Sequence, residues 1–490
     1  MATVQDRGQF HGGETSTINR RQTQAHEFGK GCQPGSVTQE VDSGDRRPRI
    51  PRRDHTSKSI ASTCFGILAR GPSASTRPFH DPEVALRFSF LLLLLCWILS
   101  AADESAPNSA LEKHRWFELR DLVLGSHSSA LYRFYVATAF NDPKSAEKEL
   151  REVESTGEHK DRLANMYFSL NRLYYRIGNY RKAADAIERC LALANQDPTP
   201  QDKASIFSFR QLPSLKVVAR RPSVIKYSHP LDWQQVAIPI DVNGKPAQYI
   251  VDSDAVMCVV SQQEAKRLGL RMIRGGAPFE GITGRSEMKE FAVADRLKIG
   301  NTEVRNVAFI VFPDDTEVFA KLPAGQRGAV GLSVLIALET VGWNGTGEFR
   351  IGFPGEPADL RNANLSFDDT SPLTLVEIQG HKLAVDLDTG TDISAIWPRF
   401  GLEFPELVEG ARESKFSVRG ATGSADLKSV TLPELRIKAG GFPIFFRNAP
   451  VLLDATIAIS RWHYGQLGVD QFSQASELKL DFRALRFELK

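Results

Sequence analysis

Two aspartates, Asp252 and Asp388, occupy positions where their side chains could act as general acid and base. Each follows an apolar, strand-like run, and each is followed by a hydroxyl residue, Ser253 or Thr389, with Gly390 next in the second case. Two carboxyl groups held a few ångströms apart cannot both ionise readily, so they share one proton. Such a pair can activate a water molecule for attack on a carbonyl carbon.

The two aspartates lie in stretches that match each other at a nearly constant offset. Each stretch has a strand, a tight turn with glycine and a returning strand that ends at the aspartate, and the aspartates are 136 residues apart. Further downstream, Gly-x-x-Gly and Gly-x-apolar-Gly segments recur at offsets of 139 and 137 residues. The pattern predicts an internal repeat of about 135 residues. The matched pairs are 281–284 with 420–423, 328–331 with 465–468, and strand-like 347–353 with 477–482.

The order of strand, Asp-Thr/Ser-Gly, glycine-bearing hairpin and apolar-apolar-Gly resembles a retropepsin-like or pepsin-like aspartic protease unit, present here twice. The resemblance covers residues 230–490. It implies a mainly β, bilobal barrel domain with one lobe at 230–360 and the other at 361–490. A cleft would run between the lobes, with Asp252 and Asp388 facing each other in it.

The resemblance also implies roles for the residues around the pair. Asp252 and Asp388 would activate water to hydrolyse a peptide bond, without metal or organic cofactor. Ser253 and Thr389 would cross-bond the two loops, and Gly390 would leave room for the Gly-x-apolar-Gly loop. Two flap hairpins would close over an extended polypeptide substrate. Their glycines are Gly281 and Gly284 in the first lobe and Gly420 and Gly423 in the second.

The sequence departs from the family at two positions. Asp254 stands where glycine is usual, and Asp386, two residues before Asp388, stands where an apolar residue is usual. Extra acids could raise the pKa of the pair, or they could have accumulated after activity was lost. Two hypotheses therefore stay open: a secreted aspartic endopeptidase, and a degenerate peptide-binding or scaffolding protein. His463 is expected to be structural.

Helical periodicity predicts a small α-helical domain at 105–200. Tyr167, Leu170 and Tyr174 share one helix face; a turn at 178–180 and a second helix with Ala183, Ile187 and Cys190 follow. This segment resembles a tetratricopeptide hairpin, and a weaker hairpin is expected at 131–153. Asp197–Pro200 should close the domain, and 201–229 should be a linker, which could also cover the cleft as in a zymogen.

The N-terminal region has the features of an export signal. A 13-residue apolar run at 88–100 follows Arg87 and ends in small residues, which predicts a signal peptide at 85–102. An uncleaved signal that acts as a membrane anchor is the alternative. Residues 1–84 are polar and lack apolar periodicity, so they are expected to be disordered or mis-annotated. The protein would be exported to the periplasm or envelope, or secreted.

Composition narrows the possible partners. A net charge of +2 with 42% hydrophobic residues gives no argument for a nucleic-acid partner. The five cysteines form no CxxC motif, so a structural zinc site is not expected. Cys190 and Cys258 could form a disulfide or stay as buried free thiols. The expected partner is a polypeptide, and the lobes are expected to pair within one chain as a monomer, with a dimer left open.

Overall fold

The computed structural model describes residues 105–126, 128–157, 159–231, 234–280, 286–421, 423–454 and 462–490. The predicted extension at 1–84 and signal at 85–102 lie outside these residues, as do the flap glycines Gly281 and Gly284. Among the residues that are described, no helix is both long enough and apolar enough to span a membrane.

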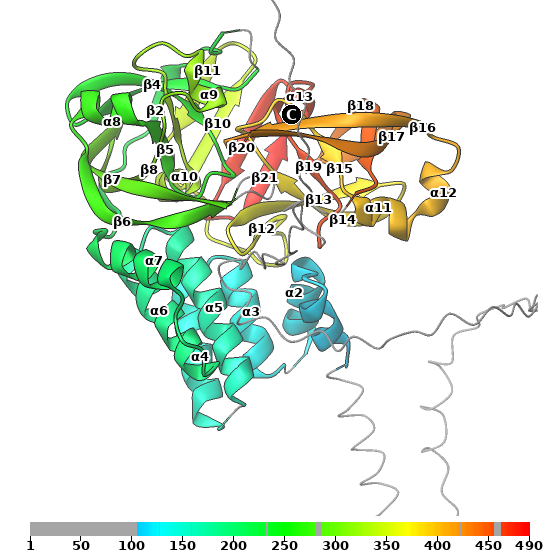
Figure 1. The fold of residues 1–490 in the computed structure, drawn as a ribbon. Coiled ribbons are helices and arrows are strands. Elements are labelled where there is room, and N and C mark those ends of the chain that lie inside the picture. The colour runs from blue at the N-terminus through cyan, green and yellow to red at the C-terminus, as the bar shows by residue number, and fades with distance from the viewer. Residues whose placement is uncertain are drawn as a thin grey trace, which may run out of the picture.

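A group of helices precedes the β domain and lies against one side of it (Figure 1). The predicted hairpins are present as antiparallel helix pairs, and Asp142 caps one of the helices by accepting the backbone N–H groups of Lys144 and Ser145. Asn171 is buried and donates to the Ala183 carbonyl at 2.8 Å, so it bridges a helix pair. The tetratricopeptide likeness remains a prediction. The helices are α2 (Trp116–Gly125), α3 (Ala130–Ala139), α4 (Pro143–Ser155), α5 (Lys160–Arg176), α6 (Tyr180–Leu193) and α7 (Pro200–Gln211).

The predicted linker at 201–229 is ordered structure. It holds most of α7 and the strands β1 (Lys216–Ala219) and β2 (Ser223–Lys226), which join two different sheets. Pro200 does not close the helical domain, because it occupies the first turn of α7, where a missing N–H costs nothing. Thr199 and Asp202 form a capping box that starts this helix.

The first lobe is an eight-stranded sheet that closes on itself through an additional β7–β8 pairing. Its strand order is β1-β8-β5-β9-β4-β3-β7-β6. The strands other than β1 are β3 (Ala237–Val242), β4 (Lys245–Val251), β5 (Cys258–Ser261), β6 (Arg271–Glu280), β7 (Ser286–Ile299), β8 (Thr302–Phe312) and β9 (Gly328–Val330), with helices α8 (Gln262–Leu268), α9 (Glu317–Ala320) and α10 (Leu332–Leu338) between them.

The second lobe has an eight-stranded sheet closed by a β13–β17 pairing, in the order β12-β13-β14-β19-β15-β18-β17-β16. Apart from β1 and β12, the strands of the two lobes follow one another around their sheets in the same cyclic order. The second lobe contains β12 (Leu365–Asp368), β13 (Ser371–Ile378), β14 (His381–Leu387), β15 (Ala395–Ile396), α11 (Pro398–Glu403), α12 (Pro405–Val408), β16 (Arg412–Gly420), β17 (Gly423–Ala439), β18 (Phe442–Leu452), β19 (Gly465–Leu467) and α13 (Val469–Phe472).

A third sheet joins the lobes. It contains β2, β10 (Thr340–Asn344) and β11 (Glu348–Ile351) from the first half and β20 (Glu477–Asp481) and β21 (Arg486–Leu489) from the second, in the order β2-β11-β10-β20-β21. By position, β20 corresponds to β10, so the sequence match of 477–482 with 347–353 paired it with the wrong strand. The prediction of a mainly β bilobal domain after a helical segment is confirmed.

Helix α7 fastens the helical segment to the first lobe. The hydroxyl of Ser208 accepts the N–H of Gly276 at 2.7 Å and lies against the irregular part of β6. Elsewhere on the interface, Arg176 is buried, with its guanidinium 4.2 Å from the ring of Phe367 in β12. The helices therefore pack against both lobes.

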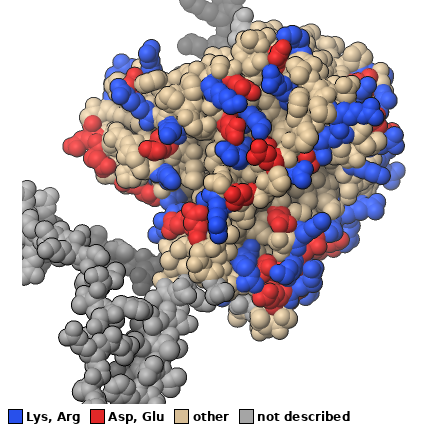
Figure 2. Space-filling model, turned by 180° about the vertical axis from the view of Figure 1, so that it is seen from behind, with Lys and Arg blue, Asp and Glu red and all other residues tan. Residues whose placement is uncertain are grey.

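Two further predictions can be compared with the structure. Cys258 is a buried free thiol, so it does not pair with Cys190. Lysines and arginines alternate with acidic side chains over the face in Figure 2. This mixing agrees with the small net charge of the chain.

Candidate active site

Corresponding loops of the two lobes carry the predicted pair. Asp252 follows β4 and donates its backbone N–H to Val330 at the end of β9 (3.1 Å). Asp388 follows β14 and donates in the same way to Leu467 at the end of β19 (3.0 Å). Each pairing is parallel, so the ladder delivers each aspartate to the same edge of its sheet. Both aspartates are half-buried.

Four reciprocal hydrogen bonds tie these loops together. The Thr389 hydroxyl accepts from Ser253 N (3.0 Å) and donates to Val251 O (2.8 Å). The Ser253 hydroxyl accepts from Thr389 N (3.0 Å) and donates to Leu387 O (2.7 Å). Both hydroxyl residues are buried. The two lobes of one chain therefore meet through the side chains that sequence reasoning assigned to this task.

Glycine is required at position 390 because the carboxyl group of Asp252, from the other loop, lies against it. A Cβ added to Gly390 would lie 2.4 Å from Cγ of Asp252, so only glycine lets that carboxyl group approach. Sequence reasoning expected the Gly-x-apolar-Gly loop here, and that loop approaches the next residue: a Cβ added to Gly468 would lie 2.7 Å from the carbonyl oxygen of Thr391. The atoms nearest to Gly390 itself belong to Asp252.

The two carboxyl groups differ in their hydrogen bonds. Oδ1 of Asp252 accepts the N–H groups of Asp254 (3.0 Å) and Ala255 (2.9 Å). Oδ1 of Asp388 accepts from Gly390 N (2.8 Å), while its Oδ2 accepts from the side chain of Gln466 (2.7 Å). Gln466 was missed, although it is the variable residue of the second Gly-x-apolar-Gly segment. The pair is therefore pseudo-symmetric in its loops and asymmetric in its carboxylate environment.

Burial and mutual repulsion keep protons on this pair. Burial raises the pKa of the Asp252 carboxyl group, although the hydrogen bonds that it accepts from the N–H groups of Ala255 and Asp254 act in the opposite direction. Burial raises the pKa of Asp388 well above its usual range, and the charges of Asp252 and Asp254 add to this. The titration belongs to the pair, so one ionised and one protonated carboxyl group is the expected state over a range of pH.

Asp254 adds a third acid at the same place. The residue as a whole is exposed, but its carboxyl group lies against the second lobe, where Oδ1 accepts a hydrogen bond from Ser371 (3.1 Å), at the start of β13. Burial of its carboxyl group among protein atoms, with the charges of Asp386 and Asp252, raises the pKa of Asp254 to about 7. Residue 254 corresponds to Gly390 in the other loop, so it carries a Cβ where its counterpart has none.

Asp386 lies behind the pair in a buried ionic contact that sequence reasoning did not find. His463 Nδ1 is 2.8 Å from Asp386 Oδ1, and the Trp397 indole donates to Asp386 Oδ2 at 3.1 Å. His463 is 3% exposed, and no sequence motif distinguished it from other histidines. Its role is taken up below.

The flap prediction names two hairpins, one in each lobe. Gly281 and Gly284 lie outside the described residues. Gly420 and Gly423 pair with each other and close the β16–β17 hairpin. Ala421, at the tip of this hairpin, packs against an apolar cluster that is formed jointly by the first lobe and the helical segment. The second hairpin therefore reaches beyond its own lobe.

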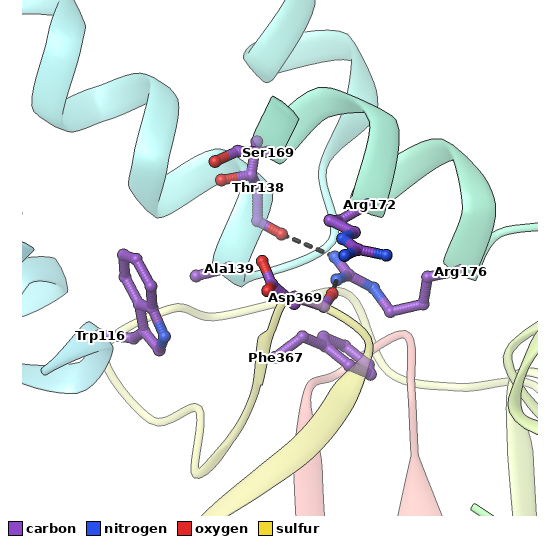
Figure 3. Close-up of a pocket in the computed structure, with 8 residues that line it drawn as sticks. All are labelled: Trp116, Thr138, Ala139, Ser169, Arg172, Arg176, Phe367 and Asp369. Atoms are coloured by element: carbon purple, nitrogen blue, oxygen red, sulfur yellow. Dashed lines mark hydrogen bonds between the residues drawn. The ribbon is translucent and has the colours of Figure 1, made fainter. Parts of the chain in front are cut away.

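The pocket in Figure 3 lies away from the aspartate pair. It is formed between the helices and the β12–β13 turn, where the guanidinium of Arg176 donates to the Thr138 carbonyl at 2.7 Å. It has room for about one water molecule, too little for a substrate segment. Its lining residues are Trp116, Thr138, Ala139, Ser169, Arg172, Arg176, Phe367 and Asp369.

Comparison with known proteins gives one family match. Residues 238–334, which include Asp252 but not Asp388, match the family model described as aspartyl protease. No curated protein matches this chain.

Among the solved structures that match parts of the chain are an aspartic protease and a soybean globulin. A retropepsin-like aspartic protease from Rickettsia conorii is 17% identical over 28% of this chain and 92% of its own, with a TM-score of 0.20. Basic 7S globulin from soybean is 10% identical over 55% of this chain and 96% of its own, with a TM-score of 0.31. These TM-scores are too low for either structure to support a conclusion about function.

Proposed function

Because residues 238–334 match the aspartyl protease family model, we propose that the protein is an aspartic endopeptidase. Asp252 and Asp388 would be its catalytic residues. The observation that carries the proposal is the set of reciprocal hydrogen bonds between Ser253 and Thr389. These bonds bring two aspartates from separate loops to one place, with the Asp252 carboxyl group seated against Gly390.

The reaction would use water as the nucleophile. The ionised member of the pair takes a proton from a water molecule as its oxygen attacks the scissile carbonyl carbon. The protonated member donates its proton to the carbonyl oxygen, which gives a tetrahedral diol. Collapse of the diol breaks the C–N bond, and the amine leaves with a proton returned by the pair. The raised pKa values of Asp252 and Asp388 favour this singly protonated starting state.

The substrate would be an extended polypeptide bound under the β16–β17 hairpin. An extended segment pairs with strand edges through main-chain hydrogen bonds. The reach of Ala421 beyond its own lobe, to an apolar cluster formed by the first lobe and the helical segment, supports this placement. The predicted duplication, an exported location and pairing of the lobes in a monomer belong to the same proposal.

A second function, non-catalytic binding of a polypeptide, is favoured by one observation. Asp254 has a Cβ and a third negative charge at the position that corresponds to Gly390. The Asp388 carboxyl group accepts one loop N–H where that of Asp252 accepts two, and its other oxygen accepts from Gln466. Such an asymmetry would arise if catalytic geometry had been relaxed after activity was lost.

Cleavage of an unfolded protein substrate, scanned from acid to neutral pH, tests the proposal. Cleavage that is blocked by a transition-state-mimicking inhibitor and lost in Asp388→Asn supports the protease. Absence of cleavage from a folded sample at every pH contradicts it. Asp254→Gly then separates the two functions, since gain of cleavage in this variant would identify a degenerate protease.

A further inference from the structure

A buried row of carboxylates and imidazole rings runs from the helical segment to the strand of Asp388. His114 Nδ1 lies 2.8 Å from Asp368 Oδ1, and His463 Nε2 lies 2.9 Å from Asp368 Oδ2. On its other side, His463 Nδ1 lies 2.8 Å from Asp386 Oδ1, an ion-pair contact whose N–H is not aligned for a hydrogen bond. The groups follow one another in a row, and the described residues hold no metal-binding cluster.

Neighbouring aromatic side chains fix the row in place. The Trp397 indole donates to the second oxygen of Asp386 (3.1 Å), so this carboxylate cannot rotate freely. At the other end, the ring of His114 stacks on Trp462, with centroids 4.7 Å apart and planes 8° from parallel. Asp368, Asp386 and His463 are all buried. The arrangement is therefore rigid and shielded from water.

The row holds a positive charge between two negative ones. Burial alone would lower the pKa of His463, but the carboxylates of Asp386 and Asp368 outweigh it and raise the pKa to about 10. The pKa of Asp368 is held well below its usual range despite burial, by His114 and His463. A histidine with a raised pKa stabilises the fold fully below its unfolded value near 6.5, and this contribution fades as pH approaches 10. The His463 imidazole therefore keeps its positive charge over acid and neutral pH.

Asp386 is placed to act on the catalytic pair. It lies two residues before Asp388 in the extended chain, so both side chains project to the same face. The charge of Asp386 raises the pKa of Asp388, with a smaller effect than burial and the charges of Asp252 and Asp254. The charged and titratable groups packed around this region are Asp252 and Asp254 of the first-lobe loop, Asp368 of β12, His463 and Tyr464 before β19, His114 of the helical segment, and Arg399 of α11 with its partner Glu403.

We propose that Asp386, held by His463 and Trp397, is a positioning residue that keeps one proton on the Asp252/Asp388 pair as pH rises. This inference rests on the proposed protease function. A buried carboxylate near the pair disfavours the second ionisation, so the active, singly protonated state persists to higher pH. His463 in turn lies 2.8 Å from Asp386 and balances the charge of a carboxylate that would otherwise be buried without an ionic partner.

Asp386→Asn tests this role because asparagine keeps an acceptor for Trp397 and removes the charge. The higher of the two pKa values of the pair should fall by about one unit, the size expected for a charge some 7 Å away at an effective dielectric constant between 20 and 80. The alkaline limb of the pH profile of kcat/KM should shift to lower pH by the same amount. The matched control is Asp241→Asn, at the far end of the corresponding hairpin of the first lobe, which should shift nothing.

A second readout separates this inference from the proposed function. Carboxyl-carbon NMR titration of labelled aspartates reports the pKa values of the pair even in a protein that cleaves nothing. If the wild type is inactive but the pKa still falls in Asp386→Asn, the protease proposal fails and the positioning role stands. An unchanged or raised pKa overturns the positioning role. If Asp386→Asn does not fold, Asp386→Leu combined with His463→Gln should show the same fall, because glutamine can still donate to Asp368.

Discussion

Replacing Thr389 by valine should weaken the junction of the two lobes with almost no change of shape. The hydroxyl of Thr389 accepts the Ser253 N–H and donates to the Val251 carbonyl, and both contacts are buried. A buried donor or acceptor left unpaired costs about 1–3 kcal/mol, so the free energy of unfolding should fall by about 2–6 kcal/mol. Valine fills the same volume, so no cavity contributes to the loss.

Urea denaturation followed by tryptophan fluorescence measures this loss. Thr391→Val is the matched control, because its hydroxyl contacts only the backbone of Ile393, accepting from its N–H (3.2 Å) and donating to its carbonyl (3.5 Å), in a more exposed loop. It should cost less than about 1 kcal/mol. In a double-mutant cycle, Thr389→Val and Ser253→Ala should be non-additive by about 0.5–3 kcal/mol, because both hold the same two loops. A loss as small as that of the control, together with simple additivity, would refute the interlobe role of these hydroxyls.

Three other predictions concern single sites. Gly390→Ala should abolish cleavage while the protein stays folded, since its Cβ would lie 2.4 Å from Cγ of Asp252; retained cleavage would show that this close approach is not needed. Ser208→Ala should speed amide exchange in β6, because Gly276 N–H loses its 2.7 Å partner, whereas Ser205→Ala, which loses only a bond within its own helix, should not. The Cys258 thiol, whose pKa burial raises to about 12, should resist alkylation at pH 8 until urea unfolds the chain; rapid reaction of the native protein would contradict its burial.

The parts of the fold that follow from short-range patterns could be predicted from the sequence. Asp252 and Asp388 lie at the ends of corresponding strands, because an apolar run followed by Asp and a hydroxyl residue specifies both a strand and its stop. The helix pairs could be predicted because apolar spacing and turn residues act within about fifteen residues of each other. The 201–229 region was misjudged because a linker and a strand that joins a distant sheet can have similar composition, and pairing of β2 with β11 is a long-range event.

The surroundings of the aspartate pair could be predicted less well from the sequence. His463 and Asp368 are 95 residues apart, and only the fold brings their side chains together. No spacing rule links them, since their contact depends on how β12 packs beside the segment that leads into β19. Gln466 could have been noticed as the polar residue within an apolar Gly-x-apolar-Gly segment. The oddity of Asp386 was visible in the sequence, but the histidine that makes it tolerable was not.

The most direct test of the central claim compares Asp252→Asn, Asp388→Asn and the double variant in cleavage of one peptide substrate. If the two residues work as one unit, each single change should lower kcat/KM by at least about a thousandfold, and the double variant should be little worse than either. All three variants should keep the wild-type unfolding midpoint to within a small shift, because neither carboxylate closes the loops. A single variant that cleaves at nearly the wild-type rate would contradict a shared catalytic pair.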